Sequence, residues 1–269
     1  MLGPHAPDTC APDLLHAVRS TAQDLGCPIT IHLAQTEDEL AVVASRYNMT
    51  PVEYLDSVKL LGPDLIAAHC VYATDKDLDI ILARQSTVAN CVVSFARAGI
   101  NVPLSRTTMR GIRTGIGTDS HGMNMISELR TAGFFSKLHC SNPQVASAYD
   151  LVHAATTAGA QGLGRNDLGR LAPNCKADLL VIDMAKPHLQ PVWDPVKNLI
   201  WKGSSSDIAA IIIDGQIVVA DGVSTMVDEA AVIRQASEAV HKVWDMAESR
   251  GVLNRAITNG APKVWRSQE

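Results

Sequence analysis

The sequence predicts an α/β fold built on parallel strands, and three patterns support this. Short runs of apolar, often β-branched residues recur through the first 140 residues. Each run is followed by a longer segment with helical periodicity, which is the order typical of parallel βαβ units covered on both faces. Further along, the pattern changes to short strands with a tight turn, which predicts a smaller second sheet. A chain of 269 residues with 46% hydrophobic residues is long enough to bury such a core.

Four predicted strands alternate with predicted helices in the first part of the chain. The strands are the apolar runs at residues 28–33, 65–69, 86–91 and 113–117. Segments with helical periodicity follow at residues 37–47, 51–60, 75–84, 104–110 and 123–138. This alternation predicts that the four strands lie parallel in one sheet.

A further helix is predicted before the first of these strands. Residues 12–25 are amphipathic, with Pro12 at the start and Gly26 directly after the end, which are typical helix start and stop signals. A helix at this place in a βαβ pattern should follow a strand. Residues 2–10 are therefore interpreted as the last residues of that strand and its loop.

The C-terminal part has a different pattern. An alanine-rich helix is predicted at residues 149–163, and β-rich segments follow at 169–183 and 208–222. The second segment contains a hairpin at residues 213–217 with an Asp-Gly turn. A last helix is predicted at residues 227–249. These elements predict a small second sheet followed by a terminal helix.

Charge and cysteine usage argue against several classes of partner. The net charge is −5 and the 23 Lys and Arg residues are scattered, so neither nucleic acid nor an anionic membrane is expected as the main partner. The most apolar stretch, residues 208–220, is interrupted by Asp214 and Gly215 and is too short to span a bilayer. No signal peptide is visible, and the 6 cysteines stand singly, which predicts reduced thiols in a cytoplasmic protein.

Polar residues that could carry chemistry stand at the carboxyl ends of successive predicted strands. His32 and His69 lie at two such ends, Asp119 follows a third, and His5 lies at the end of the N-terminal segment. A single residue of this kind is more often a local hydrogen-bonding group. Three on neighbouring parallel strands would meet at one edge of the sheet, where α/β proteins place their sites. Cys70 lacks the partners of a nucleophile and is interpreted as a core residue.

Histidine and aspartate together suit Zn²⁺ or another divalent ion such as Fe²⁺. Such an ion lowers the pKa of a bound water and supplies hydroxide near neutral pH. A neighbouring His or Asp can then move protons. The pattern therefore predicts a hydrolytic metal site built from His32, His69 and Asp119.

Several longer motifs resemble those of a known family. They are PHAPDTCAPDLL, IHLAQTEDE, LIAAHCVYATDKD, GIGTDSHGMNM and KADLLVIDMAKPHLQPVWDP. Over residues 3 to about 222 the sequence is similar to the amidohydrolase superfamily, in its branch of triazine chlorohydrolases and methylthioadenosine/S-adenosylhomocysteine or nucleobase deaminases. The resemblance implies a (β/α)₈ TIM-type barrel with a small β-sandwich, of which this sequence matches about the second half of the barrel, strands four to eight.

The same resemblance implies a division of the chain. Residues 1–165 would form the partial barrel with the active-site strand ends, and residues 166–222 a segment of the sandwich. Residues 223–269 would form a C-terminal helix and tail that pack back on the barrel.

The resemblance also implies roles for single residues. His32 matches the fifth-strand metal ligand, and Asp119 matches the eighth-strand aspartate that binds metal and accepts a proton from the attacking water. His69 matches the sixth-strand histidine, which polarises the substrate or helps to move protons beside the metal. His5 matches a histidine that lines the substrate pocket. His121 lies close to Asp119 in sequence, and no role is assigned to it.

The sequence departs from the family pattern in two ways. The family's metal centre uses a His-x-His pair on the first barrel strand, and this sequence contains no His-x-His. Deaminases of the family usually carry Glu, which protonates a ring nitrogen of the substrate, where this chain has Gln35. Glutamine can donate a hydrogen bond to the substrate but cannot transfer a proton.

A half barrel would leave a sheet edge open, and such an edge invites pairing with another chain. Three arrangements are considered: a homodimer, a chain completed by a second polypeptide, and a piece of a longer reading frame, of which the last is favoured. The predicted function is a metal-dependent hydrolase that cleaves a C–N bond of a cyclic or heteroaromatic small molecule by metal-activated water, typically a deamination. The alternatives are an inactive or incomplete fragment and a dechlorinating hydrolase.

Overall fold

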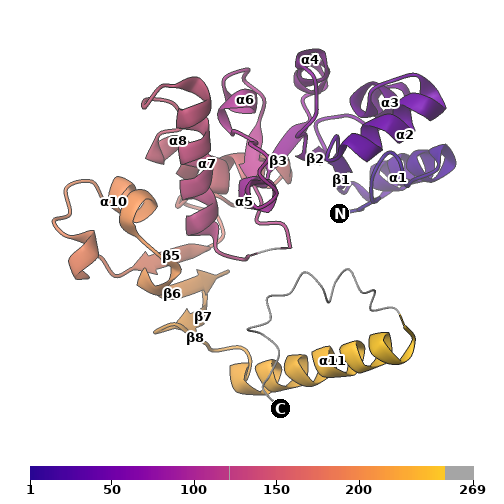
Figure 1. The fold of residues 1–269 in the computed structure, drawn as a ribbon. Coiled ribbons are helices and arrows are strands. Elements are labelled where there is room, and N and C mark those ends of the chain that lie inside the picture. Colours follow the sequence, from indigo (N-terminus) through magenta and orange to yellow (C-terminus); the bar gives the residue numbers. More distant parts are fainter. Residues whose placement is uncertain (121, 252–269) are drawn as a thin grey trace.

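The computed structural model describes residues 1–120 and 122–251, so the candidate His121 lies outside the described residues. Two four-stranded sheets organise this part of the chain (Figure 1). The first has the order β1-β2-β3-β4, and all of its neighbouring strands are parallel. Its strands are β1 (Ile29–Leu33), β2 (Leu65–His69), β3 (Thr87–Asn90) and β4 (Thr114–Ile116). The predicted parallel sheet is therefore confirmed.

Helices precede, connect and follow these strands, and all but the short one at residues 92–96, where an irregular loop was expected, were predicted from the periodicity. They are α1 (Pro12–Leu25), α2 (Glu37–Tyr47), α3 (Pro51–Ser57), α4 (Asp75–Ala83), the short α5 (Val92–Ala96) and α6 (Ser105–Thr108), and α7 (Met125–Cys140). Threonine caps begin three of them, because the side chains of Thr36, Thr50 and Thr74 accept hydrogen bonds from backbone N–H groups in the first turn. Gly26 ends α1 in the left-handed conformation, with φ of 58°.

The N-terminal segment extends the parallel sheet beside β1. Leu2 forms a parallel bridge with Ile29, and Thr30 N donates to Leu2 O at 2.9 Å. Three residues further on, His32 N donates to His5 O at 3.1 Å. These bonds place residues 2 and 5 parallel to β1, as the interpretation of this segment predicted, and they bring His5 beside His32.

Alternate residues of the parallel strands fill the core. In both β1 and β2 the first, third and fifth residues are buried and the others are half-buried. Helices α1 to α4 pack against the buried side and contribute fully buried Leu15, Leu55, Leu78 and Ile81. The carboxyl ends of all four strands meet at one edge of the sheet, which is the edge that carries the candidate residues.

The predicted helix at 149–163 is interrupted. The chain forms α8 (Ala148–His153), a π-helical turn (Ala154–Ala158) and α9 (Gly159–Gly162). The interruption lies against β4: a Cβ atom on Gly115 would stand 3.3 Å from Gly159 Cα and 3.8 Å from Ala154 O. Backbone packs directly on backbone here, and such close approach is not visible in hydrophobic periodicity.

The second sheet is antiparallel with the order β5-β6-β7-β8. Its strands are β5 (Leu179–Ile182), β6 (Ile208–Ile213), β7 (Gln216–Ala220) and β8 (Val223–Ser224). The predicted Asp-Gly hairpin is confirmed, with φ of 49° at Asp214 and 81° at Gly215. Between β5 and β6 the chain forms helices that the sequence did not predict, namely α10 (Pro195–Lys202) and two 3₁₀ turns (Pro187–Leu189 and Ser205–Asp207).

The last described element is α11 (Glu229–Ser249), which lies apart from both sheets in Figure 1. None of its residues is buried, and its apolar Val240 and Trp244 are 52% and 51% exposed. The packing of this helix on the barrel stays a prediction, as does the division of the chain near residues 165 and 222. Within the described ranges, no helix has both the length and the apolar character needed to cross a membrane.

Candidate functional site

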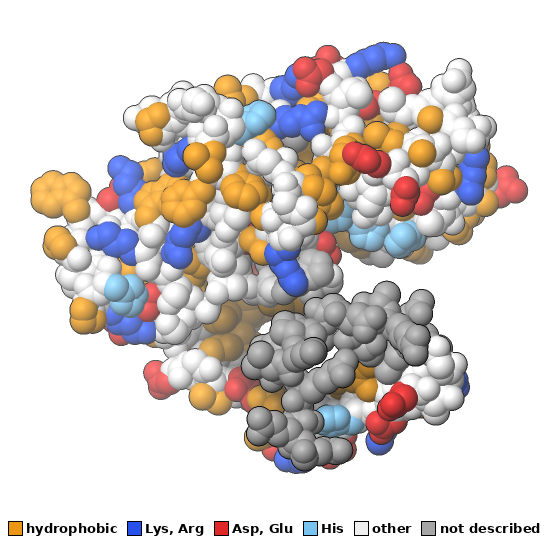
Figure 2. All heavy atoms as spheres, viewed as in Figure 1, with side chains coloured by type: hydrophobic (Ala, Val, Ile, Leu, Met, Phe, Trp, Pro, Cys, Tyr) orange, Lys and Arg blue, Asp and Glu red, His pale blue; other side chains and the backbone are white. Residues whose placement is uncertain are grey.

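Three histidines stand in a row at the carboxyl edge of the parallel sheet. The His5 and His32 ring centroids are 5.1 Å apart with an interplanar angle of 65°. The His32 and His69 rings are stacked, 5.3 Å apart at an angle of 6°. Figure 2 shows histidine side chains grouped on the surface near the N-terminus that Figure 1 marks. The topology thus brings together three of the residues that the sequence predicted.

The tautomer of one of these rings follows from its hydrogen bond. His32 Nδ1 lies 2.8 Å from His5 O, and because a carbonyl oxygen only accepts, Nδ1 donates. In the neutral ring the Nε2 atom of His32 therefore carries a lone pair, the form in which histidine binds metals or accepts protons. His5 Nδ1 is hydrogen-bonded to Thr9 Oγ1 at 2.7 Å.

His69 is the buried member of the row. Its side chain is 4% exposed, and its Nδ1 atom has no hydrogen-bond partner among the described residues. Burial and, to a smaller extent, the neighbouring His32 lower the pKa of His69 to about 4, against the opposing effect of Asp119. The ring is therefore neutral at pH 7, with a buried nitrogen free to meet a ligand.

Asp119 follows β4 and is exposed. Partial burial raises the pKa of this carboxyl, but nearby Ser94, the Ser120 N–H and the positive form of His69 outweigh that effect, so that the pKa lies below its ordinary value. Ser120 N donates to Asp119 Oδ1 at 2.6 Å. The Ser94 hydroxyl is close enough to act on the pKa, although its geometry falls short of a hydrogen bond. Asp119 is thus ionised near neutral pH and can accept a proton.

The backbone at this edge is held in an unusual conformation. Four residues at or shortly after the carboxyl ends of the strands have positive φ: Ala34 (49°), His69 (80°), Cys70 (52°) and Asp119 (54°). Non-glycine residues adopt this region at a cost, and a group of them at the ends of neighbouring strands is a feature that functional sites often show. Burial raises the pKa of the Cys70 thiol, which supports its interpretation as a core residue and not a nucleophile.

A pocket of about 490 Å³ opens beside Asp119. It is lined by Gln35 from the β1–α2 loop, Tyr72 from the β2–α4 loop, and Phe95 from α5. The Phe95 ring meets the His69 ring edge-to-face, with centroids 5.0 Å apart. The structure thus places Gln35 and Asp119 in one pocket, with the histidine row outside its lining. Tyr72 and Phe95 were missed in the sequence, although both follow predicted strands closely.

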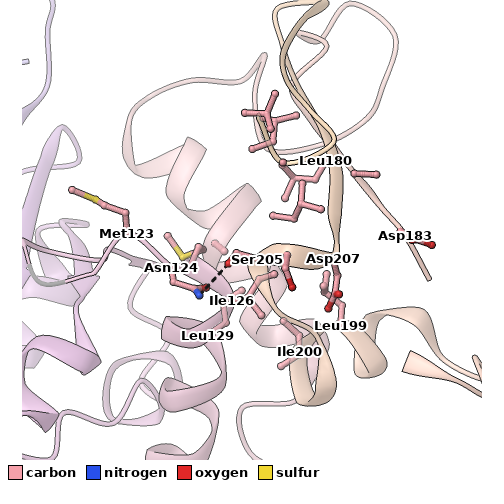
Figure 3. A pocket seen from close by; sticks show the side chains of 18 of the residues that line it. Met123, Asn124, Ile126, Leu129, Leu180, Asp183, Leu199, Ile200, Ser205 and Asp207 are labelled. Carbon is pink, nitrogen blue, oxygen red and sulfur yellow. Dashed lines mark hydrogen bonds between the residues drawn. The ribbon is translucent and has the colours of Figure 1, made fainter. Parts of the chain in front are cut away.

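A larger cavity of about 1020 Å³ lies elsewhere, between α7, α10 and the antiparallel sheet (Figure 3). Its walls include Ile126, Leu129, Leu180 and Ile200. None of the candidate histidines or Asp119 lines it. We therefore regard the smaller pocket, which Asp119 and Gln35 line, as the candidate site.

The donor chemistry of the site fits zinc. His32 offers an unprotonated Nε2, Asp119 a carboxylate, and His69 a buried nitrogen without a partner. Within residues 1–120 and 122–251, however, no three His, Cys, Asp or Glu side chains converge closely enough to hold a metal ion. The described part of the chain therefore supplies suitable ligands but not a closed coordination sphere.

Known proteins resemble this chain over most of its length. The model of the amidohydrolase family matches residues 1–218. A 5'-deoxyadenosine deaminase of Methanosarcina mazei is 34% identical over 90% of this chain, and a 5-methylthioadenosine/S-adenosylhomocysteine deaminase of Moorella thermoacetica is 36% identical over 90%. A solved structure of an adenosine deaminase from Xanthomonas campestris with bound zinc superposes with a TM-score of 0.86 at 26% identity, over 90% of this chain.

The fold also resembles that of a mutant of atrazine chlorohydrolase TrzN from Arthrobacter aurescens, with a TM-score of 0.82 at 24% identity over 88% of this chain. All of these matches cover only part of the other protein. The chain spans 57% and 58% of the two curated relatives, and 57% and 54% of the two solved structures.

Proposed function

Because the chain belongs to the amidohydrolase family, we propose that it carries part of the active site of a metal-dependent deaminase acting on a heteroaromatic small molecule. The observation that carries this proposal is the row of His5, His32 and His69 at the carboxyl edge of parallel strands, with Asp119 near enough to act on the pKa of His69. The names of the relatives point to adenine nucleosides as the substrate class.

Each side chain has a role in this proposal. His32, through Nε2, and Asp119 would hold zinc, with His69 beside them. When bound, zinc supplies hydroxide near neutral pH. Asp119, whose pKa is lowered, would accept a proton from the attacking water. Neutral His69 would donate a hydrogen bond to the substrate, or would relay that proton by taking it from Asp119 at one ring nitrogen and passing it to the leaving group. His5 and Gln35 would contact the substrate.

The proposed architecture is part of a (β/α)₈ barrel. Strands β1 to β4 would be barrel strands five to eight, and the segment that bridges Leu2 to Ile29 would be the end of strand four. The antiparallel sheet would be a segment of the accompanying sandwich.

A metal-binding measurement combined with a deamination screen tests the proposal. The purified chain is titrated with Zn²⁺ and assayed for ammonia release from adenosine, 5'-deoxyadenosine and 5'-methylthioadenosine. We expect zinc binding that His32→Ala and Asp119→Asn weaken and that His16→Ala, a change at an exposed residue of α1, leaves unchanged. Equal zinc affinity in all four proteins would contradict the proposed site, whatever the screen shows.

Gln35 favours dechlorination as a second candidate function. It lines the pocket, and its amide cannot protonate a ring nitrogen as a carboxylic acid can. Chloride leaves without a proton. Hydrolysis of a chloro-substituted heterocycle therefore has less need of an acid at position 35 than a deamination has. Release of chloride, but not ammonia, from paired chloro- and amino-substituted heterocycles would favour this function. Gln35→Glu should then increase release of ammonia relative to chloride.

The incomplete ligand set supports a third possibility, in which the site is completed by residues of another polypeptide or remains inactive. The chain contains no His-x-His, and no three ligands converge in its described part. In this case zinc would bind weakly to the chain alone. Co-purification with a partner, and tight zinc binding only in that complex, would distinguish the completed site from an inactive one.

A further inference from the structure

Two glutamates are buried behind the candidate site. Glu39 on α2 and Glu128 on α7 are each 1% exposed. Neither takes part in an ion pair among the described residues. A carboxylate removed from water needs strong hydrogen-bond partners. The partners are backbone N–H groups, of the β1–α2 loop for Glu39 and of helix α5 for Glu128, and both segments carry residues of the candidate site.

Glu39 bridges two successive amides of the β1–α2 loop. Its Oε1 accepts from Ala34 N and its Oε2 from Gln35 N, both at 2.8 Å. Ala34 is one of the positive-φ residues, and it lies two positions after His32. The carboxylate therefore fixes the unusual backbone from which Gln35 enters the pocket and which directly follows His32.

Glu128 makes a comparable contact with α5, the helix that carries Phe95 of the pocket. It accepts from Val93 N, in the first turn of α5, at 2.9 Å. The two residues that follow Val93 are Ser94, which acts on Asp119, and Phe95, which packs edge-to-face on His69. A carboxylate on α7 thus determines where α5 presents these two side chains.

We propose that Glu39 and Glu128 are positioning residues of the site, which act through the β1–α2 loop and α5 and not by contact with substrate. The positioning role itself does not depend on the proposed function. The expected effects on zinc binding and catalysis do. Burial raises the pKa of both carboxyl groups, and the hydrogen bonds from backbone N–H groups offset part of that rise. The same hydrogen bonds that position the backbone therefore also stabilise the buried charge.

The test compares Glu39→Gln and Glu128→Gln with a control, Glu53→Gln. Glu53 also accepts a backbone bond, from Thr50 N at 3.0 Å, and pairs with Lys76, but it caps α3 away from the site. A glutamine side chain has one oxygen and one NH₂ group. At position 39 its oxygen can accept only one of the two hydrogen bonds, and its NH₂ group would face the other backbone N–H, which is also a donor. At position 128 it can keep its single bond, so a smaller effect is expected.

Two readouts are measured on the full chain: the ¹⁵N-histidine ring signals in the absence of metal, and the affinity for Zn²⁺. We expect Glu39→Gln to shift the His32 and His69 ring signals and to weaken zinc binding roughly 10- to 100-fold, as loss of an outer-shell partner does. Glu128→Gln should shift the His69 signal and act less on zinc. Glu53→Gln should lower the melting temperature and leave both readouts unchanged.

The outcomes separate this inference from the proposed function. If none of the variants changes the ring signals beyond the control, the positioning role is wrong. If the ring signals shift but the parent chain binds no zinc, the positioning role stands and the proposed metal site fails. If Glu39→Gln does not fold, Glu128→Gln carries the same test, and an unshifted His69 signal there overturns the proposal.

Discussion

Strands β2 and β6 have similar apolar sequences, LIAAH and IAAIII, but very different surroundings. In β2 the first, third and fifth residues are buried, whereas β6 has no buried residue. Helices pack on one side of the parallel sheet and complete a core, while the antiparallel sheet retains exposed Leu180 and Ile217, 52% and 54% exposed. Strand formation thus follows the local sequence, but stabilisation by burial depends on what covers the strand.

The largest effect on stability should come from comparing a leucine-to-alanine substitution in the parallel sheet with one in the antiparallel sheet. Leu65 in β2 is 0% exposed, and Leu180 in β5 is 52% exposed. We expect Leu65→Ala to lower the free energy of unfolding by about 2–5 kcal/mol, because it removes buried contacts and leaves a cavity. Leu180→Ala should cost less than about 1 kcal/mol. Urea unfolding of both variants measures the difference, and equal losses would show that the antiparallel sheet is covered in solution.

The pH dependence of stability should come partly from His69. Its pKa is lowered to about 4 from 6.5, so the unfolded chain binds a proton at higher pH than the folded, metal-free chain does. The stability due to neutral His69 is therefore complete above pH 6.5 and is lost as the pH falls toward 4. The full loss is about 3 kcal/mol, at about 1.4 kcal/mol per pKa unit.

The variant His69→Asn isolates this contribution, because asparagine does not titrate. We expect the difference in unfolding free energy between the parent and the variant to shrink between those two pH values, in urea titrations with a metal chelator present. A difference that is independent of pH would mean that the ring is accessible to water and not desolvated.

A smaller effect is expected where the C-terminal part meets the parallel half. A Cβ atom on Gly133 in α7 would lie 2.7 Å from Trp201 Cη2 and 2.9 Å from Leu151 Cδ1. Gly133→Ala should therefore force α7 and α10 apart and lower the melting temperature, at a cost of about 1–3 kcal/mol. Gly122→Ala, where the added atom would meet nothing within 4 Å, is the matched control. An unchanged melting temperature in Gly133→Ala would show that α10 packs loosely.

The smallest effect is expected in α11. Trp244 is 51% exposed and Val240 is 52% exposed, and α11 has no buried residue. Trp244→Ser should change the free energy of unfolding by less than about 0.5 kcal/mol, as surface substitutions do. A loss of about 2 kcal/mol or more would instead support the predicted packing of this helix on the barrel, because such values require burial. Thermal unfolding monitored by far-UV circular dichroism measures it.

Most of the parallel half could be predicted from the sequence, because its signals are local. The helix Pro12–Leu25 and the strand Leu65–His69 have the predicted bounds, since proline, glycine and apolar runs mark their ends. The interruption near Gly159 and the helix Pro195–Lys202 were missed. The first depends on contact with Gly115, and contacts between distant segments leave no periodic pattern.

For the candidate site, residue types at strand ends predicted which side chains would meet, and the structure brings His5, His32 and His69 into a row. The convergence of three metal ligands was not found in the described residues. Glu39 and Glu128 were not identified from the sequence, because a glutamate on a helix looks like surface until its partner amides are known.

The left-handed backbone at His69, with φ of 80°, has a consequence for engineering of this chain. Glycine would adopt that conformation without strain, so a screen for thermostable variants would favour replacements that relax this residue and its neighbours. Selection for heat resistance alone would then replace His69 and remove one of the three neighbouring imidazoles. Variant libraries intended to preserve catalysis should therefore keep position 69 fixed.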